Sequence, residues 1–287
     1  MVTLRLAAAS AVIGLALVAC GDASNNTAGQ WHGVGAGLSG NGLPSNSNPS
    51  NTQGDGGVAK DSSAPPSGSF SVMVGSSTAD VELRAATLPI VVTVAPTNFT
   101  GAVVLTVTGL PAGVTATFDK QSVNVSGNAG ASASLTLTTM STTAVGPIAA
   151  MITATSGSST QSSALTLNVK PILTINIPMN VDAMKGTPGN PSKNVFGTFP
   201  IMITAPANLG ANPIQVKIYN ADSAGHCIHA SNPNQGFPHD PVTNGVCNAL
   251  TQKGQFDGQA RAITAAGTYT FYLHDQGDLT EGQIKVQ

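Results

Sequence analysis

From residue 69 to the C-terminus, apolar residues recur at every second position in short runs that Gly, Pro and Asn interrupt. Clear examples are the runs at 103–107 (Val-Val-Leu-Thr-Val) and 165–169 (Leu-Thr-Leu-Asn-Val). Because successive side chains of a strand point to opposite faces, each run can bury one face of a sheet. Turn-forming residues at 109–113 and 146–147 separate the runs, and no long amphipathic pattern indicates a helix. The sequence therefore predicts an all-β fold of antiparallel β-sandwiches.

We expect two such sandwich domains. Residues 69–169 hold enough alternating runs for one sandwich of about seven to nine strands. At Lys170-Pro171 a proline is expected to close this unit, and strand-like runs resume at Ile172. The second sandwich is therefore predicted over residues 170–287.

The N-terminal residues 1–19 have the layout of an export signal. Arg5 precedes an apolar run over residues 6–19, which is too short to cross a bilayer comfortably. The run ends in Leu17-Val18-Ala19-Cys20-Gly21, which resembles the bacterial lipobox. This resemblance implies that Cys20 becomes an acylated N-terminus that anchors the chain to a membrane. Because Gly21 rather than aspartate follows, it also favours the outer membrane or the cell surface.

Residues 20–68 are almost all Gly, Ser, Asn, Pro, Thr and Ala. Such a segment has too little apolar surface to offset the entropy of ordering, so we expect a disordered tether. Its random-coil reach is roughly 40 Å.

Charge and cysteine content limit the partners. Only 8 % of residues are charged and the net charge is −2, so a basic surface for nucleic acid is not expected. With Cys20 assigned to lipid, Cys227 and Cys247 remain as one pair in an oxidising compartment. The sequence predicts a disulfide between them.

The segment 105–118 (Leu-Thr-Val-Thr-Gly-Leu-Pro-Ala-Gly-Val-Thr-Ala-Thr-Phe) resembles a recurrent stretch of bacterial immunoglobulin-like repeats. The resemblance implies an immunoglobulin-like sandwich over residues 69–169. Such modules usually serve as spacers or adhesive units, so this says little about function. The domain contains no histidine or cysteine, and we expect no chemistry there.

Two segments of the second domain resemble cupredoxins: 218–226 (Ile-Tyr-Asn-Ala-Asp-Ser-Ala-Gly-His) and 266–274 (Ala-Gly-Thr-Tyr-Thr-Phe-Tyr-Leu-His). The resemblance implies a cupredoxin-like sandwich, with His226 at the position of the first copper histidine. Leu273 takes the place of the copper cysteine, and Gln276 that of the second histidine. A blue-copper centre needs a thiolate and two imidazoles, so we do not expect one here.

A remodelled site is the alternative. The loop at 230–240 is long enough to fold His239 back towards His226 and His274, which predicts a copper or zinc site of three imidazoles. A metal-free scaffold with hydrogen-bonded histidines remains open. On an extended strand His226 and His229 face opposite sides, so the two are expected to share a metal only if their segment is a loop.

We do not expect an enzyme. Asp275, Asp278 and Glu281 lie near His274 in a terminal turn, but no nucleophile motif accompanies them. The leading expectation is a membrane-anchored envelope or cell-surface lipoprotein. Its second sandwich is expected to act as a non-catalytic binding module for a surface protein or glycan, displayed on an immunoglobulin-like spacer. Copper or zinc handling by His226, His239 and His274 is the alternative function.

Overall fold

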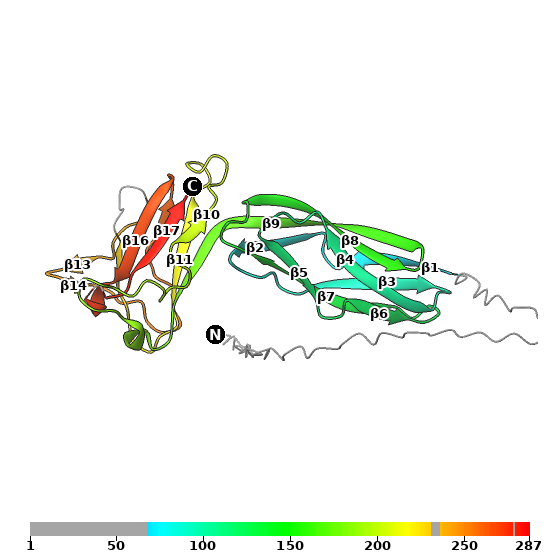
Figure 1. Ribbon diagram of the computed structural model, residues 1–287, viewed down its shortest axis with the longest axis horizontal. Helices are drawn as coiled ribbons and strands as arrows, with labels where there is room; N and C mark the ends of the chain where they lie inside the picture. Colours follow the sequence, from blue (N-terminus) through cyan, green and yellow to red (C-terminus); the bar gives the residue numbers. More distant parts are fainter. Residues whose placement is uncertain (1–67, 231–235, 278) are drawn as a thin grey trace, which may run out of the picture. The chain divides into compact units, whose positions relative to one another are not determined.

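The computed structural model describes residues 68–230, 236–277 and 279–287 (Figure 1). The predicted all-β fold is confirmed: strands dominate, and the described helical segments are the short 3-10 turns η1 (Val181–Met184) and η3 (His274–Gln276). No helix in the described ranges has the length and apolarity needed to span a membrane. The predicted signal peptide, the acylated Cys20 and the tether lie outside the described residues.

The first sandwich consists of two packed sheets (Figure 1). One sheet has the order β1-β3-β7-β5, comprising β1 (Ser69–Val74), β3 (Ile90–Thr97), β7 (Ala131–Thr139) and β5 (Val114–Phe118). The other contains β2 (Thr78–Leu83), β9 (Ser159–Ile177), β8 (Gly146–Ser156), β4 (Gly101–Thr108) and β6 (Ser122–Val125). The runs read from the sequence form β4 and part of β9, and Leu105 and Leu167 on them are fully buried.

Strand β9 continues through the expected domain boundary. Its 19 residues pair with β8 over residues 159–169, with β2 between residues 166 and 173, and with β11 (Ile214–Asn220) over residues 172–177. Proline does not end the strand because Pro171 lies where the β2 ladder shifts register, between the pairs Glu82 to Lys170 and Leu83 to Leu173. At such a bulge a residue without an N–H loses no ladder hydrogen bond.

The second sandwich is built around a sheet of order β10-β17-β16-β12. Its strands are β10 (Ile201–Ile203), β17 (Gly282–Val286), β16 (Gly267–Leu273) and β12 (Ile228–Ala230). The end of β9, β11 and β15 (Arg261–Ile263) form the other layer. Most ladders are antiparallel as expected, but β2 and β11 pair with β9 in parallel, as β10 does with β17. Long connections between these pairs permit a parallel direction.

The predicted disulfide between Cys227 and Cys247 is confirmed. Cys227 is fully buried just before β12. Cys247 ends the small hairpin of β13 (Val242–Thr243) and β14 (Val246–Cys247). The bridge therefore fastens this hairpin to the beginning of β12.

Candidate metal centre

Three half-buried histidines converge beside β12. One ring nitrogen from each of His229, His239 and His274 lies within 4.8 Å of the other two. Their rings also pack together: the centroids of His229 and His239 are 4.3 Å apart, and those of His229 and His274 are 5.4 Å apart. Among the histidine, cysteine and acidic side chains of the described residues, these three histidines form the group whose geometry could hold a metal ion.

Strand pairing places two of these rings together. In the ladder between β12 and β16, His229 lies opposite Tyr272 while its neighbour Ile228 lies opposite Leu273. Ile228 and Leu273 are fully buried, so His229 and Tyr272 share the outer face. The chain then turns into η3 at His274, whose backbone N–H donates to the carbonyl of Cys227 at 2.8 Å.

A short segment that begins at residue 236 brings in the third ring. The backbone N–H of Asp240 donates to the Ile228 carbonyl at 3.0 Å, and the Ile228 N–H donates to the Asp240 carboxylate at 2.6 Å. Asp240 is itself held by Arg261, which is buried. These contacts fix His239, the residue before Asp240, next to β12.

Backbone carbonyls determine which ring nitrogens carry a lone pair. His239 Nδ1 donates to the carbonyl of Asp240, and His274 Nε2 donates to that of Gly245 at 3.2 Å. Because a carbonyl only accepts, each neutral ring keeps its lone pair on the other nitrogen, Nε2 of His239 and Nδ1 of His274. His274 Nδ1 lies 3.3 Å from His229 Nδ1. A ring N–H bound to a carbonyl is the usual support of a metal-ligating histidine.

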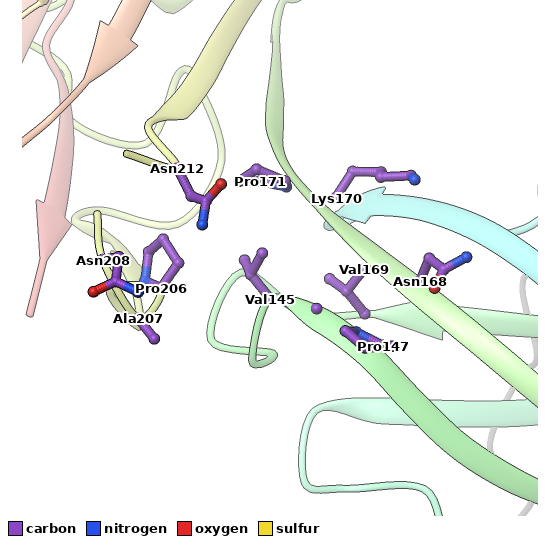
Figure 2. Close-up of a pocket in the computed structure, with 11 residues that line it drawn as sticks. Val145, Pro147, Asn168, Val169, Lys170, Pro171, Pro206, Ala207, Asn208 and Asn212 are labelled. Carbon is purple, nitrogen blue, oxygen red and sulfur yellow. The ribbon is translucent and has the colours of Figure 1, made fainter. Parts of the chain in front are cut away.

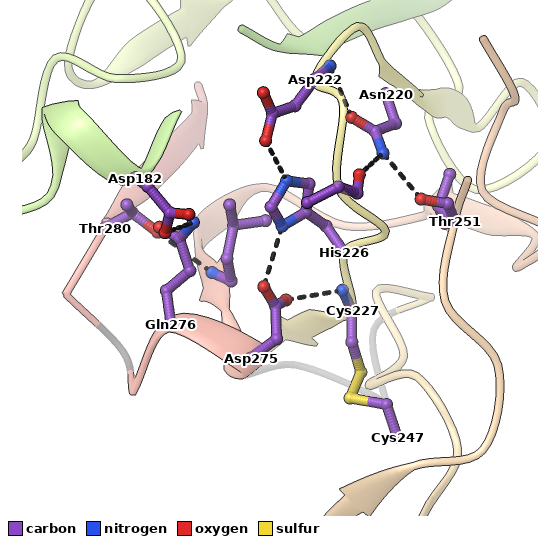
Figure 3. Close-up of polar contacts among 12 residues, drawn as sticks. Asp182, Asn220, Asp222, His226, Cys227, Cys247, Thr251, Asp275, Gln276 and Thr280 are labelled. Atoms are coloured by element: carbon purple, nitrogen blue, oxygen red, sulfur yellow. Dashed lines mark hydrogen bonds and ion pairs between the residues drawn. A yellow bond between two sulfur atoms is a disulfide. The ribbon is translucent and has the colours of Figure 1, made fainter. Parts of the chain in front are cut away.

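His226 does not join this group, although it is in the expected ligand set. Its Nε2 contacts the Asp222 carboxylate at 2.9 Å and its Nδ1 contacts Asp275 at 2.8 Å, as Figure 3 shows. Both ring nitrogens therefore face carboxylates inside the sandwich, where His226 is 1 % exposed. The structure thus corrects the expected set: it groups His229 with His239 and His274. The physical reason is that His226 and His229, three residues apart along an extended segment, face opposite sides.

The pKa values follow from these contacts. Burial disfavours the charged ring of His226, but the hydrogen bonds to Asp275 and Asp222 outweigh burial and raise its pKa. Burial likewise opposes ionisation of Asp222 and Asp275, yet the hydrogen bonds to His226 lower the pKa of both. These contacts favour the charged form of the His226 ring between two carboxylates. Asp275 also accepts the backbone N–H of Cys227 at 2.9 Å, so this buried cluster joins the beginning of β12 to η3 and helps to position His274.

The two other positions that the cupredoxin resemblance assigns to copper ligands, Leu273 and Gln276, do not form a metal site. Leu273 is fully buried in the core. Gln276 is nearly buried, and its Nε2 donates to Asp182 at 2.8 Å (Figure 3). Of the acidic residues considered for hydrolysis, Asp275 is paired with His226 and Asp278 lies outside the described residues.

A surface hollow of about 490 Å³ lies elsewhere in the described part of the chain. Figure 2 shows its lining, to which Asn168, Lys170, Asn208 and Asn212 contribute the polar side chains. The lining contains no histidine, cysteine or carboxylate. It therefore offers neither an acid and base pair nor a set of metal ligands.

His229 was not among the site residues expected from the sequence. The signal was present in Ile228-His229-Ala230, where apolar neighbours on both sides predict a strand whose histidine points outward. Asp222, four residues before His226, was a signal that His226 pairs with a carboxylate instead of a metal. The second carboxylate, that of Asp275, is 49 residues away from His226 in sequence, so no local pattern shows it.

No family model and no curated protein matches the chain. Among solved structures, a FixG-related protein from Vibrio parahaemolyticus is 16% identical, covers 37% of this chain and 98% of its own, and has a TM-score of 0.29. A purple cupredoxin from Nitrosopumilus maritimus is 18% identical over 40% of this chain and 98% of its own, with a TM-score of 0.24. The E. coli chaperone DraB is 10% identical over 75% of this chain and 98% of its own, with a TM-score of 0.27. Similarities this low carry no argument about function, which rests on the geometry above.

Proposed function

We propose that this protein is an extracytoplasmic, lipid-anchored protein that binds one copper or zinc ion without catalysing a reaction. The ligands are His229, His239 and His274. The observation that carries this proposal is the convergence of three imidazole nitrogens within 4.8 Å. The rings of His239 and His274 each also donate one N–H to a backbone carbonyl, which leaves the second ring nitrogen with a lone pair for a metal.

A metal ion would account for the arrangement of all three rings. His229 and His274 can share one proton between their Nδ1 atoms, but His239 already donates to a carbonyl and its second nitrogen has only a lone pair to offer. A divalent ion accepts lone pairs from all three rings at once. Imidazole is a common ligand of both zinc and copper.

The Cys227 to Cys247 disulfide supports a location outside the cytoplasm, because disulfides persist in oxidising compartments. The lipobox-like sequence ending in Cys20 supports the membrane anchor. A Cys20→Ser protein should fail to partition into Triton X-114 detergent, and unchanged partitioning would contradict acylation. The described residues bring together a group of histidines that could hold a metal ion. A surface protein or glycan partner therefore stays a prediction.

Equilibrium dialysis of the unacylated chain against Zn(II), Cu(II) and Cu(I) tests the metal. We expect one ion per chain, and we expect each of His229→Ala, His239→Ala and His274→Ala to weaken binding by at least roughly tenfold. His32→Ala, in the predicted tether, is the matched control and should bind as the parent does. No binding by the parent, or unchanged binding by all three alanine variants, would overturn the proposal.

A further inference from the structure

The geometry points to a tetrahedral ion of the zinc type at His229, His239 and His274, with its fourth position filled from solution by water or a small anion. This inference rests on the proposed metal-binding function and adds the coordination geometry and the class of the exogenous ligand. It concerns a separate set of residues from the positions that the cupredoxin resemblance assigns to copper.

The separation of two ring nitrogens indicates the geometry. Ligand atoms of a regular tetrahedron are about 1.6 times the metal to ligand distance apart, which for zinc to nitrogen bonds gives about 3.3 to 3.4 Å. Adjacent ligands of a square-planar site with bonds of similar length are only about 2.8 to 3.0 Å apart. His229 Nδ1 and His274 Nδ1 are separated by 3.3 Å, so these two rings already span a tetrahedral edge. His239, which offers a ring nitrogen within 4.8 Å of both, is the third member of the set.

The chemistry of the ligands supports the same ion. Calcium and magnesium prefer oxygen ligands, and no carboxylate belongs to the group in the described residues. A thiolate, the soft ligand that favours Cu(I), is also missing from it, because Cys227 and Cys247 are joined to each other. Three neutral imidazoles suit zinc, which in open sites takes three protein ligands and an exogenous fourth.

Among the described residues, no fourth histidine, cysteine or acidic side chain belongs to the group. The group that could hold a metal ion consists of three histidines, all of them only half-buried. The segment 231–235, which lies between His229 and His239 in the sequence, reads Ser-Asn-Pro-Asn-Gln and contains no histidine, cysteine or acid. Since three neutral rings leave the full charge of a divalent ion uncompensated, the fourth position favours hydroxide or a small anion. Asp278 lies outside the described residues, so it is tested as a competing ligand for the fourth position.

Cobalt(II) is the appropriate probe, since it takes zinc sites and reports geometry by its visible spectrum. We expect the unacylated chain to give the intense blue bands of tetrahedral Co(II), which Zn(II) should abolish. Adding azide should shift the bands, and Asp278→Asn should behave as the parent does. A faint pink octahedral spectrum would overturn the tetrahedral assignment. Bands that azide leaves unchanged in the parent, or shifts only in Asp278→Asn, would overturn the open position.

The outcomes distinguish this inference from the proposed function. If neither Co(II) nor Zn(II) binds, the metal-binding function itself fails. If Zn(II) binds with the expected loss in the three alanine variants but Co(II) is octahedral, only the tetrahedral inference fails.

Discussion

Replacing Cys227 and Cys247 together by alanine should destabilise the second sandwich by about 3 kcal/mol. The two residues are 20 apart in sequence. In the chain-entropy model, closing a loop of that length removes about 11 cal/mol/K from the denatured state, which is about 3 kcal/mol at 25 °C. Alanine is the appropriate replacement because Cys227 is fully buried, and a serine hydroxyl there would add a desolvation cost of its own.

Urea unfolding measures the effect. With a slope of about 1 to 3 kcal/mol/M, the midpoint should fall by roughly 1 to 3 M. Tyrosine fluorescence in a Trp31→Phe background reports this sandwich alone, because the chain has three tyrosines and all lie in it: Tyr219, Tyr269 and Tyr272. The parent protein reduced in metal-free buffer is the control, since it loses the bridge without any change of sequence. Equal midpoints for the oxidised parent and both bridge-free forms would refute the reasoning.

Three further predictions concern the same sandwich. Because the pKa of His226 is raised in the folded protein, the stability that its charged ring contributes should be fully present below the ordinary pKa of 6.5 and be lost as the pH rises through the folded pKa. The difference in urea midpoint between the parent and His226→Gln should therefore shrink as the pH rises. A difference that does not change with pH would contradict a charged ring. Gly282→Ala should cost about 1 to 3 kcal/mol in thermal or urea unfolding, because the added Cβ would lie 2.1 Å from the Phe271 ring, whereas Gly210→Ala enters open space and should be neutral. Copper-loaded protein should lack the intense thiolate-to-copper absorption band, since Leu273 stands where the cupredoxin resemblance would place a cysteine; such a band from the unmodified protein would refute this.

Local sequence pattern determined the class of fold and much of the core. The alternation at 103–107 and 165–169 predicted strands and their buried faces correctly, because the period of two is set by backbone geometry within each strand. The disulfide could also be predicted, since Cys227 and Cys247 are the pair that remains after Cys20. Leu273 and Gln276 cannot ligate copper in the way that cysteine and histidine do. This follows from the chemistry of their side chains alone.

Tertiary structure decided what pairs with what. The sequence at Lys170-Pro171 indicated an end, but β9 continues because its partners change there and a bulge accommodates the proline. The membership of the histidine cluster was decided in the same way. Their spacing on an extended segment makes His226 and His229 face opposite sides. The pairing of β12 with β16, together with Asp275 from the far end of the chain, decided which ring turns inward and which lies beside His239 and His274. Such contacts join residues distant in sequence, so a local pattern contains no record of them.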